Sequence, residues 1–194
     1  SSRANAVHTS AQEFVEHARK NQGKLTYAYP GNGSTPHLAG EMLNAAAGLQ
    51  TLHVTYRGAA PGMVDLLAGQ VDYLCDPGIG LGHVREGKLR LLAVASAERS
   101  SLFPDTPTLD EVGLKGFDAD SWFGFYAPAG VDKAIVDRMN AEVNRALGLP
   151  QVKNRLIELG GVPEPMSPDE FAAKTRADFE RFGAIIRERG ISVQ

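Results

Sequence analysis

The chain has 194 residues, of which 43% are hydrophobic and 22% charged, and this ordinary globular composition excludes disordered, collagen-like and mucin-like chains. The formal net charge of −3 provides no basic excess for binding nucleic acid or an anionic membrane. The single cysteine, Cys75, excludes an intrachain disulfide and a zinc site made of several cysteines. No apolar run approaches the ~18 residues of a membrane span, and the first residues lack the apolar region of a secretion signal.

Residues 10 to about 126 alternate between helical and strand-like patterns. Ser10 and Glu13 have the spacing of a capping box, which predicts a helix that ends at Gly23. Strands are expected at residues 25–29, 52–56, 71–75 and 89–95. Helices are expected at residues 35–47, with Thr35 as N-cap and Pro36 as first helical residue, at 62–69, and in a short segment that ends near residue 86. Repeated βα units of this length predict an α/β fold whose parallel sheet is flanked by helices.

The pattern changes after residue 116. The aromatic segment Phe117–Tyr126 is strand-like, and three amphipathic helices are expected at 133–147, about 151–159 and 168–189. These helices need an apolar surface to cover, yet residues 127–194 contain almost no strand. The first region, another copy of the chain or a segment outside this sequence would each supply that surface. The sequence therefore predicts a complete α/β lobe at 10–120 and a second region at 121–194 that belongs to an incomplete lobe.

Three loops follow predicted strands at one edge of the sheet, where open parallel sheets bind ligands. The loops are Pro30–His37, Arg57–Pro61 and Asp76–Gly80, and they are rich in small residues that allow a ligand to approach the backbone. Free amides at helix N-termini favour carboxylate or phosphate groups. We therefore expect a cradle for a small anion that is made mainly of main-chain groups.

Each of these residues also has a structural interpretation. The Gly31–Gly33 segment is consistent with a simple turn, and it lacks the Gly-Lys-Ser/Thr ending of a phosphate loop. His37 alone is more typical of a solvated surface histidine, and Arg57 of an exposed charge or a partner of Asp76. Tyr56 and Trp122 are consistent with core aromatic residues.

Enzyme and metal chemistry find less support. Cys75 ends an apolar strand with no histidine near it in sequence, so an inert buried thiol is expected. The five histidines show no pairing at helical spacing and no His-Glu-x-x-His motif, so neither a metal nor another cofactor is predicted. The chain also has no nucleophile elbow and no evident acid–base pair of carboxylates. The acidic residues Glu41, Asp65, Asp110 and Glu111 are expected at solvated helix positions.

Nine segments resemble, in the same order, the tripartite tricarboxylate transporter substrate-binding proteins, also called Bug-type receptors. They are GKLTYA (23–28), GSTPHLAGE (33–41), HVTYRGAAP (53–61), DLLAGQVD (65–72), GKLRLLAV (87–94), FPDTPT (103–108), SWFG (121–124), APAG (127–130) and DRMNAE (137–142). The resemblance covers nearly the whole chain. At the family's Phe-Asp position this chain has Cys75 and Asp76, so the cysteine departs from the pattern.

This resemblance implies a periplasmic-binding-protein-like (type II) fold with two hinged lobes that enclose a small carboxylate or dicarboxylate. It also implies a periplasmic location, a membrane permease of the same transporter type as partner, no enzymatic activity and no cofactor or nucleic acid. The implied ligand-binding residues are Gly33, Ser34, Thr35, His37, Tyr56, Arg57, Gly58, Ala59, Asp76 and Phe123.

Family members extend further at the N-terminus, so the resemblance implies that part of the first lobe is absent and that residues 1–9 cross between lobes. A half-clamp of this kind is expected to bind small carboxylates weakly or not at all. The C-terminal helices would then cover their apolar faces in a homo-oligomer or against a displaced element. Two alternatives remain open: a self-associating or signalling module that keeps the fold without transport, and a small α/β enzyme that uses His37, Asp76 or Cys75.

Overall fold

The computed structural model describes residues 2–3, 6 and 8–191, without the side chains of residues 3 and 189. The rest of the N-terminal stretch 1–9, expected to cross between lobes, lies outside the described residues. Contacts divide the chain into one compact unit of Ser1–Ser121 with Ile185–Gln194 and a second of Trp122–Ala184. No helix in the described part of the chain combines the length and the apolar character needed to cross a membrane.

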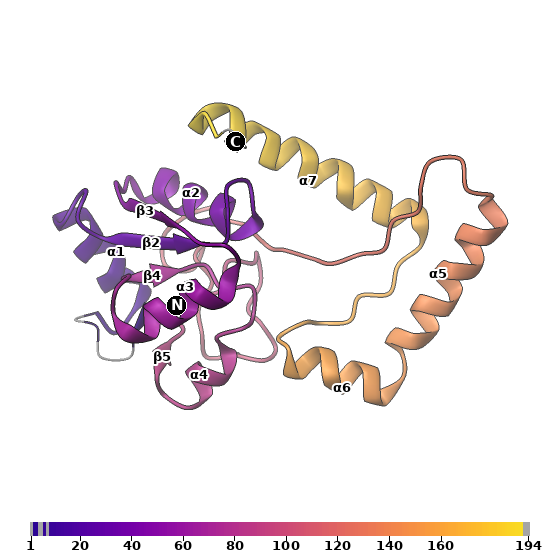
Figure 1. The fold of residues 1–194 in the computed structure, drawn as a ribbon, viewed down its shortest axis with the longest axis horizontal. Coiled ribbons are helices and arrows are strands. Elements are labelled where there is room, and N and C mark those ends of the chain that lie inside the picture. The colour runs from indigo at the N-terminus through magenta and orange to yellow at the C-terminus, as the bar shows by residue number, and fades with distance from the viewer. Residues whose placement is uncertain (1, 4–5, 7, 192–194) are drawn as a thin grey trace. The chain divides into compact units, whose positions relative to one another are not determined.

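The first unit contains a sheet whose strands lie in the order β3-β2-β4-β1-β5. Figure 1 labels four of them, β2 to β5. The strands are β1 (Ser2–Arg3), β2 (Thr26–Tyr29), β3 (Leu52–Thr55), β4 (Tyr73–Leu74) and β5 (Leu89–Arg90). Strand β2 pairs in parallel with β3 and β4, as expected. Strand β1, which the sequence pattern did not predict, is antiparallel to both β4 and β5. The strands β2 to β5 therefore all run in the same direction, and β1 fills the place between the last two.

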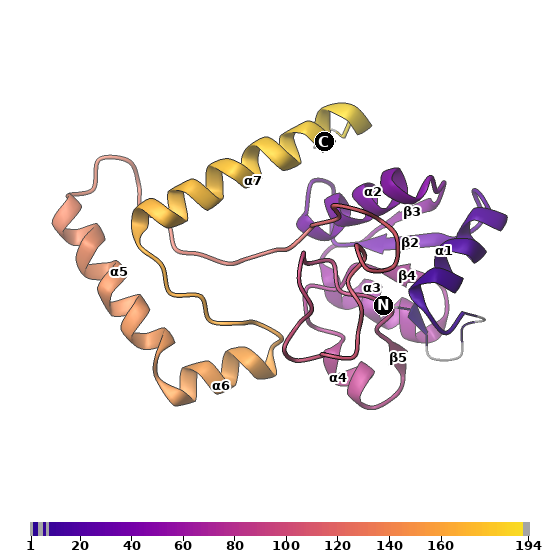
Figure 2. The same cartoon turned by 180° about the vertical axis from the view of Figure 1, so that it is seen from behind.

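Helices cover both faces of this sheet, which confirms the predicted α/β class (Figures 1 and 2). The helices are α1 (Ala11–Lys20), α2 (Thr35–Ala47), α3 (Ala59–Ala68) and α4 (Leu81–Arg85). Tyr27 and Tyr29 of β2 pack into one hydrophobic cluster with α1 and α2. Ala28, between them, packs into a second cluster with α3 and β4. Successive side chains of a strand point to opposite faces, so these three residues fix which helix covers which side.

Local capping groups set the helix starts. The Ser10 hydroxyl accepts the Glu13 amide, while Glu13 Oε2 accepts the amide and hydroxyl of Thr9. Helix α2 is capped by Ser34, one residue before the predicted Thr35. Helix α3 begins at Ala59 rather than at residue 62, because Pro61 lies within the first turn, where a proline needs no amide partner.

Strand β5 ends at Arg90 and not at residue 95, as the apolar pattern predicted, and residues 91–121 form loops and turns. Only an isolated bridge, between Val94 and Thr108, extends the pairing among the described residues. Asp110 and Glu111 lie in turns and not on a helix, which corrects the expectation. The Thr108 hydroxyl accepts the Glu111 amide, while Glu111 Oε2 accepts the Thr108 amide.

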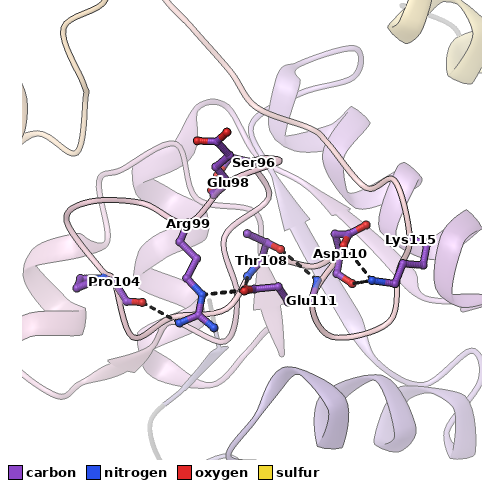
Figure 3. Close-up of polar contacts among 8 residues, drawn as sticks. All are labelled: Ser96, Glu98, Arg99, Pro104, Thr108, Asp110, Glu111 and Lys115. Carbon is purple, nitrogen blue, oxygen red and sulfur yellow. Dashed lines mark hydrogen bonds and ion pairs between the residues drawn. The ribbon is translucent and has the colours of Figure 1, made fainter.

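An arginine completes the connections of this loop region. The Arg99 Nε donates to both oxygens of Glu111, and its Nη1 donates to the Pro104 carbonyl (Figure 3). Hydrogen bonding from the Arg99 side chain lowers the pKa of Glu111, and the hydrogen bond from the Thr108 amide makes the next largest contribution in the same direction. Asp110 joins Lys115 and the Gly116 amide in the same way. Asp110 and Glu111 thus have structural partners within this loop region.

The second unit consists of helices and an extended segment. The helices α5 (Lys133–Leu147), α6 (Pro150–Glu158) and α7 (Pro168–Arg189) match the predicted ranges closely, and α7 runs on into the first unit. The expected strand at Phe117–Tyr126 is wrong: in the described structure this segment pairs with no strand. Instead, Trp122 Nε1 donates to Asp178 of α7, and the Phe171 ring packs against Trp122 and Tyr126.

Residues 122–184, all of which the structure describes, include no buried residue. Large apolar side chains lie exposed on each part of this unit: Phe123, Phe125, Tyr126, Ile135, Met139, Leu159, Val162 and Phe179. Many exposed large apolar side chains on a small unit are typical of a surface that packs against something else. The sequence pattern predicts that the amphipathic helices of this unit need an apolar surface from elsewhere. In the structure they do not bury their apolar faces within the unit.

Acid destabilisation is expected from His8, whose side chain is buried against Phe14. Burial, with smaller contributions from the charges of His17 and Arg90, lowers the pKa of His8 below 6.5. The native state therefore takes up its proton at lower pH than the unfolded chain, so stability should fall as the pH drops below about 6.5, by up to about 1 kcal/mol per pH unit. Urea unfolding at several pH values should show a shallower slope for His8→Gln. The control variant His83→Gln changes a half-buried histidine near Glu86 and should keep the wild-type slope. An equal slope in all three proteins would contradict this assignment.

Candidate functional site

A pocket lies where β2 and β4 end and α3 begins, all within the first unit. Its lining residues are Ala28, Tyr29, Pro30, Gly58, Ala59, Gly62, Met63, Leu74, Cys75, Asp76, Pro77 and Ile79. The pocket thus combines residues from all three predicted loops at the carboxyl edge of parallel strands, the position that open α/β sheets use for ligands.

The N-terminus of α3 forms the part of this pocket that can attract an anion. Its N-cap, Gly58, has φ +104°, a backbone conformation that glycine adopts readily, and it supplies no side-chain cap. The first amides of an α-helix have no acceptor within the helix and carry partial positive charge. Ala59 and Gly62, both on the first turn, line the pocket through small or absent side chains. A carboxylate can therefore approach this helix end closely.

The loop before α2 uses its polar groups internally. The Gly33 amide donates to Nδ1 of His37 (3.0 Å). The Ser34 hydroxyl donates to the Gly31 carbonyl and accepts the His37 amide. None of Gly33, Ser34, Thr35 and His37 is among the residues that line the pocket. His37 is buried and stacks on Tyr29, rather than being the solvated side chain that its sequence context suggested.

Tyr56 and Arg57 lie beside the pocket without lining it. The Tyr56 hydroxyl donates to Asp65 of α3 (2.7 Å), so this carboxylate is a helix anchor rather than an unpartnered solvated group. Burial, followed by this hydrogen bond, raises the pKa of Tyr56 to about 12. The Tyr56 ring also lies 3.2 Å from the point that a Cβ atom on Gly62 would occupy. Tyr56 therefore positions the first turns of α3, while Arg57 is exposed.

Asp76 contributes a carboxylate to the pocket wall. Its oxygens accept the amides of Gly78 (2.9 Å) and Gly80 (2.8 Å), so the side chain holds the loop before α4 in shape. The adjacent Cys75 has a pKa raised by burial to about 11, which keeps its thiol protonated at neutral pH. A protonated thiol is a poor nucleophile, so the pocket lacks an activated cysteine. Phe123 belongs to the second unit and is 91% exposed.

Sequence reasoning missed one cluster of titratable groups. His37 and Glu41 on α2 and His53 on β3 bring one potential metal-ligand atom each within 4.8 Å of one another. Glu41 was expected at a solvated helix position, but it is buried. His37 and Glu41 lie four residues apart, a spacing that places both on one helix face and is visible in the sequence, whereas the contribution of His53 from β3 depends on the fold.

Comparison with known proteins places these observations in a family. Residues 2–191 match the family described as the tripartite tricarboxylate transporter family receptor, TctC. The chain is 36% identical over 178 residues to a protein encoded in the tcbD-tcbE intergenic region of Pseudomonas sp. strain P51, covering 91% of this chain and 53% of that protein. It is 32% identical to BugT of Bordetella pertussis, covering 95% of this chain and 57% of BugT. The chain therefore spans about half the length of these curated relatives.

Solved structures give the same result. The structure of R. palustris Rpa4515 with adipate has a TM-score of 0.90 and 30% identity, covering 99% of this chain and 64% of that one. The periplasmic binding protein BugD has a TM-score of 0.86 and 33% identity, with 99% and 65% covered. MatC of Rhodopseudomonas palustris with bound malate has a TM-score of 0.85 and 32% identity, with 95% and 64% covered. From its sequence match and its fold, the chain belongs to the Bug-type receptors of the tripartite tricarboxylate transporter family.

Proposed function

We propose that this chain supplies the anion-binding lobe of a periplasmic receptor for a small dicarboxylate. The observation that carries the proposal is the uncapped start of α3, which faces a pocket lined by Gly58, Ala59 and Gly62. Backbone amides at such a helix end stabilise a carboxylate without a dedicated side chain. The relatives with adipate and malate support this ligand class.

The two ends of the ligand would meet different groups. One carboxylate lies at the first turn of α3, and the exposed guanidinium of Arg57, next to Gly58 in the chain, favours a second negative charge nearby. The negative charge of Asp76 disfavours a ligand with a further carboxylate on that side of the pocket, because like charges repel. Gly33, Ser34, Thr35, His37 and Tyr56 shape the neighbouring loops, while a ligand contact of Phe123, which belongs to the second unit, stays a prediction.

Residues 10–120 are the complete ligand-binding lobe in this proposal, and residues 121–194 belong to the other lobe. The receptor delivers its ligand to a membrane permease of the same transporter type and catalyses no reaction. A protein with both lobes encloses its ligand and excludes water, which strengthens each polar contact. One lobe alone holds the carboxylate on one side only, so we expect it to bind with millimolar affinity or more weakly.

The proposal is tested by comparing charged and neutral ligands of the same shape. Titration of the chain with adipate, followed by NMR, should give saturable shifts of amide resonances, whereas the neutral diamide adipamide should give none at the same concentrations. The difference arises because only the acid benefits from the partial positive charge of the helix start. Equal shifts with both compounds, or none with adipate, would argue against an anion site.

A second function, self-association, is favoured by the exposed apolar side chains of the second unit. We expect sedimentation of the chain to depend on concentration, and Phe179→Ser on α7 to shift it toward monomer. Arg176→Ser removes a long exposed side chain from the same helix but no apolar patch, so it should behave as the wild type. A wild-type chain that remains monomeric at all concentrations would exclude this function.

A further inference from the structure

The cluster of His37, Glu41 and His53 joins a helix to a neighbouring strand. His37 and Glu41 lie four residues apart on α2, a spacing that places both on one helix face. His53 lies on β3, and its Nε2 is 3.1 Å from Glu41 Oε1. With one ligand atom from each residue within 4.8 Å of the others, small side-chain movements would bring all three to one ion.

The surroundings of the cluster hold its rings in place and favour a cation. Glu41 and His37 are 4% and 5% exposed, so the carboxylate has lost its water and gains strongly from a positive charge beside it. The His37 ring stacks on Tyr29 at 4.2 Å, and the His53 ring packs edge-on against Tyr27. The His53 side chain is 35% exposed, which leaves the cluster accessible from solvent on that side.

We propose that His37, Glu41 and His53 form a binding site for a divalent transition-metal ion, with zinc as the expected occupant. Two imidazoles and one carboxylate are the protein ligands of many three-ligand zinc sites, in which water takes the fourth position. Magnesium and calcium prefer oxygen ligands, so a site with two nitrogen donors disfavours them. The site is separate from the proposed carboxylate pocket, since none of the three residues lines that pocket.

Metal binding has a specific consequence for the loop before α2. The Gly33 amide donates to Nδ1 of His37, so the neutral ring carries its proton on Nε2 in the metal-free protein. A metal ion at Nε2 requires this proton to move to Nδ1, and a metal ion at Nδ1 displaces the Gly33 amide, so the Gly33 hydrogen bond breaks in either case. Gly33 has φ +76° and no side chain, so its peptide can reorient. Zinc should therefore shift the NMR resonance of the Gly33 amide.

Calorimetric titration of the chain with zinc alone tests the site. We expect one zinc per chain, with affinity reduced at least about 10-fold in both His53→Gln and Glu41→Gln, because loss of a ligand weakens metal binding by this order or more. His53→Gln changes a partly exposed residue, so it remains informative if Glu41→Gln fails to fold. His17→Gln and His83→Gln remove histidines elsewhere and should bind zinc as the wild type does.

Three results would overturn the proposal. The wild type could fail to bind zinc, His53→Gln could bind it as tightly as the wild type, or the loss could follow His17→Gln instead. In the last case the zinc would lie near His8 and His17, whose rings are 5.9 Å apart. An unchanged Gly33 resonance at saturating zinc would contradict the predicted loss of its hydrogen bond to His37.

Discussion

Gly40→Ala is expected to destabilise the chain by up to about 2 kcal/mol, since overpacking a well-filled core typically costs about 1–3 kcal/mol and the preference of helices for alanine offsets about 1 kcal/mol of this. A Cβ atom on Gly40 would lie 2.1 Å from Cζ of Tyr27, a distance that no relaxed structure allows. Tyr27 is fully buried at the centre of the larger hydrophobic cluster, and its hydroxyl donates to carbonyls of the first turn of α2. The ring therefore has no free space into which it can move.

Gly82→Ala is the matched control for this prediction. Gly82 also lies in a helix, α4, but a Cβ atom there would meet nothing within 4 Å. With no steric clash, only the higher helix propensity of alanine changes the stability of this variant. It should therefore be as stable as the wild type or more stable by up to about 1 kcal/mol. Urea unfolding of both variants gives the comparison. A Gly40→Ala protein as stable as the wild type would show that α2 and β2 pack less closely than the structure indicates.

The sequence predicts the helices themselves, but it does not predict the close packing of α2 against β2. Asp132 and Ser167 are capping residues that act within a few positions of the helix start, and so α5 and α7 were predicted nearly to the residue. Alternating apolar patterns likewise located β2 and β3. Local signals of this kind need no knowledge of the partner on the other side.

Features that depend on distant partners were missed. Strand β1 exists because it pairs with β4 and β5, about 70 to 90 positions further along the chain. Phe117–Tyr126 has the residues of a strand, but in the described structure it joins no sheet: Phe117 and Ala119 pack into the core of the first unit, and Trp122 and Tyr126 pack against Phe171 of α7. A strand needs a neighbour for its backbone hydrogen bonds, and composition alone does not show whether one is available.

The candidate site could be predicted only in part, because the positions of its loops follow from local patterns but the directions of its side chains depend on distant partners. The three loops could be placed at one sheet edge because parallel strands end there, and Gly58, Ala59 and Asp76 do line the pocket. The side-chain directions could not be predicted. His37 turns inward to accept the Gly33 amide, and Glu41 is buried beside His53, because both depend on tertiary contacts with β2 and β3.

The charge at the start of α3 should decide whether the chain binds an organic acid. In Ala59→Asp, the new carboxylate lies on a residue that lines the pocket and competes with the ligand for the same amides. We expect adipate affinity to fall at least about 10-fold, equivalent to about 1.4 kcal/mol. Folding should be unaffected or slightly improved, because an acidic residue in the first turn interacts favourably with the helix dipole.

Ala60→Asp adds the same charge one residue later, at an exposed position that does not line the pocket. The most direct test of the anion site is therefore an NMR titration of adipate into the wild type, Ala59→Asp and Ala60→Asp side by side. We predict saturable shifts of the α3 amides in the wild type and in Ala60→Asp, and their loss in Ala59→Asp. Undiminished adipate binding by a folded Ala59→Asp chain would contradict the account.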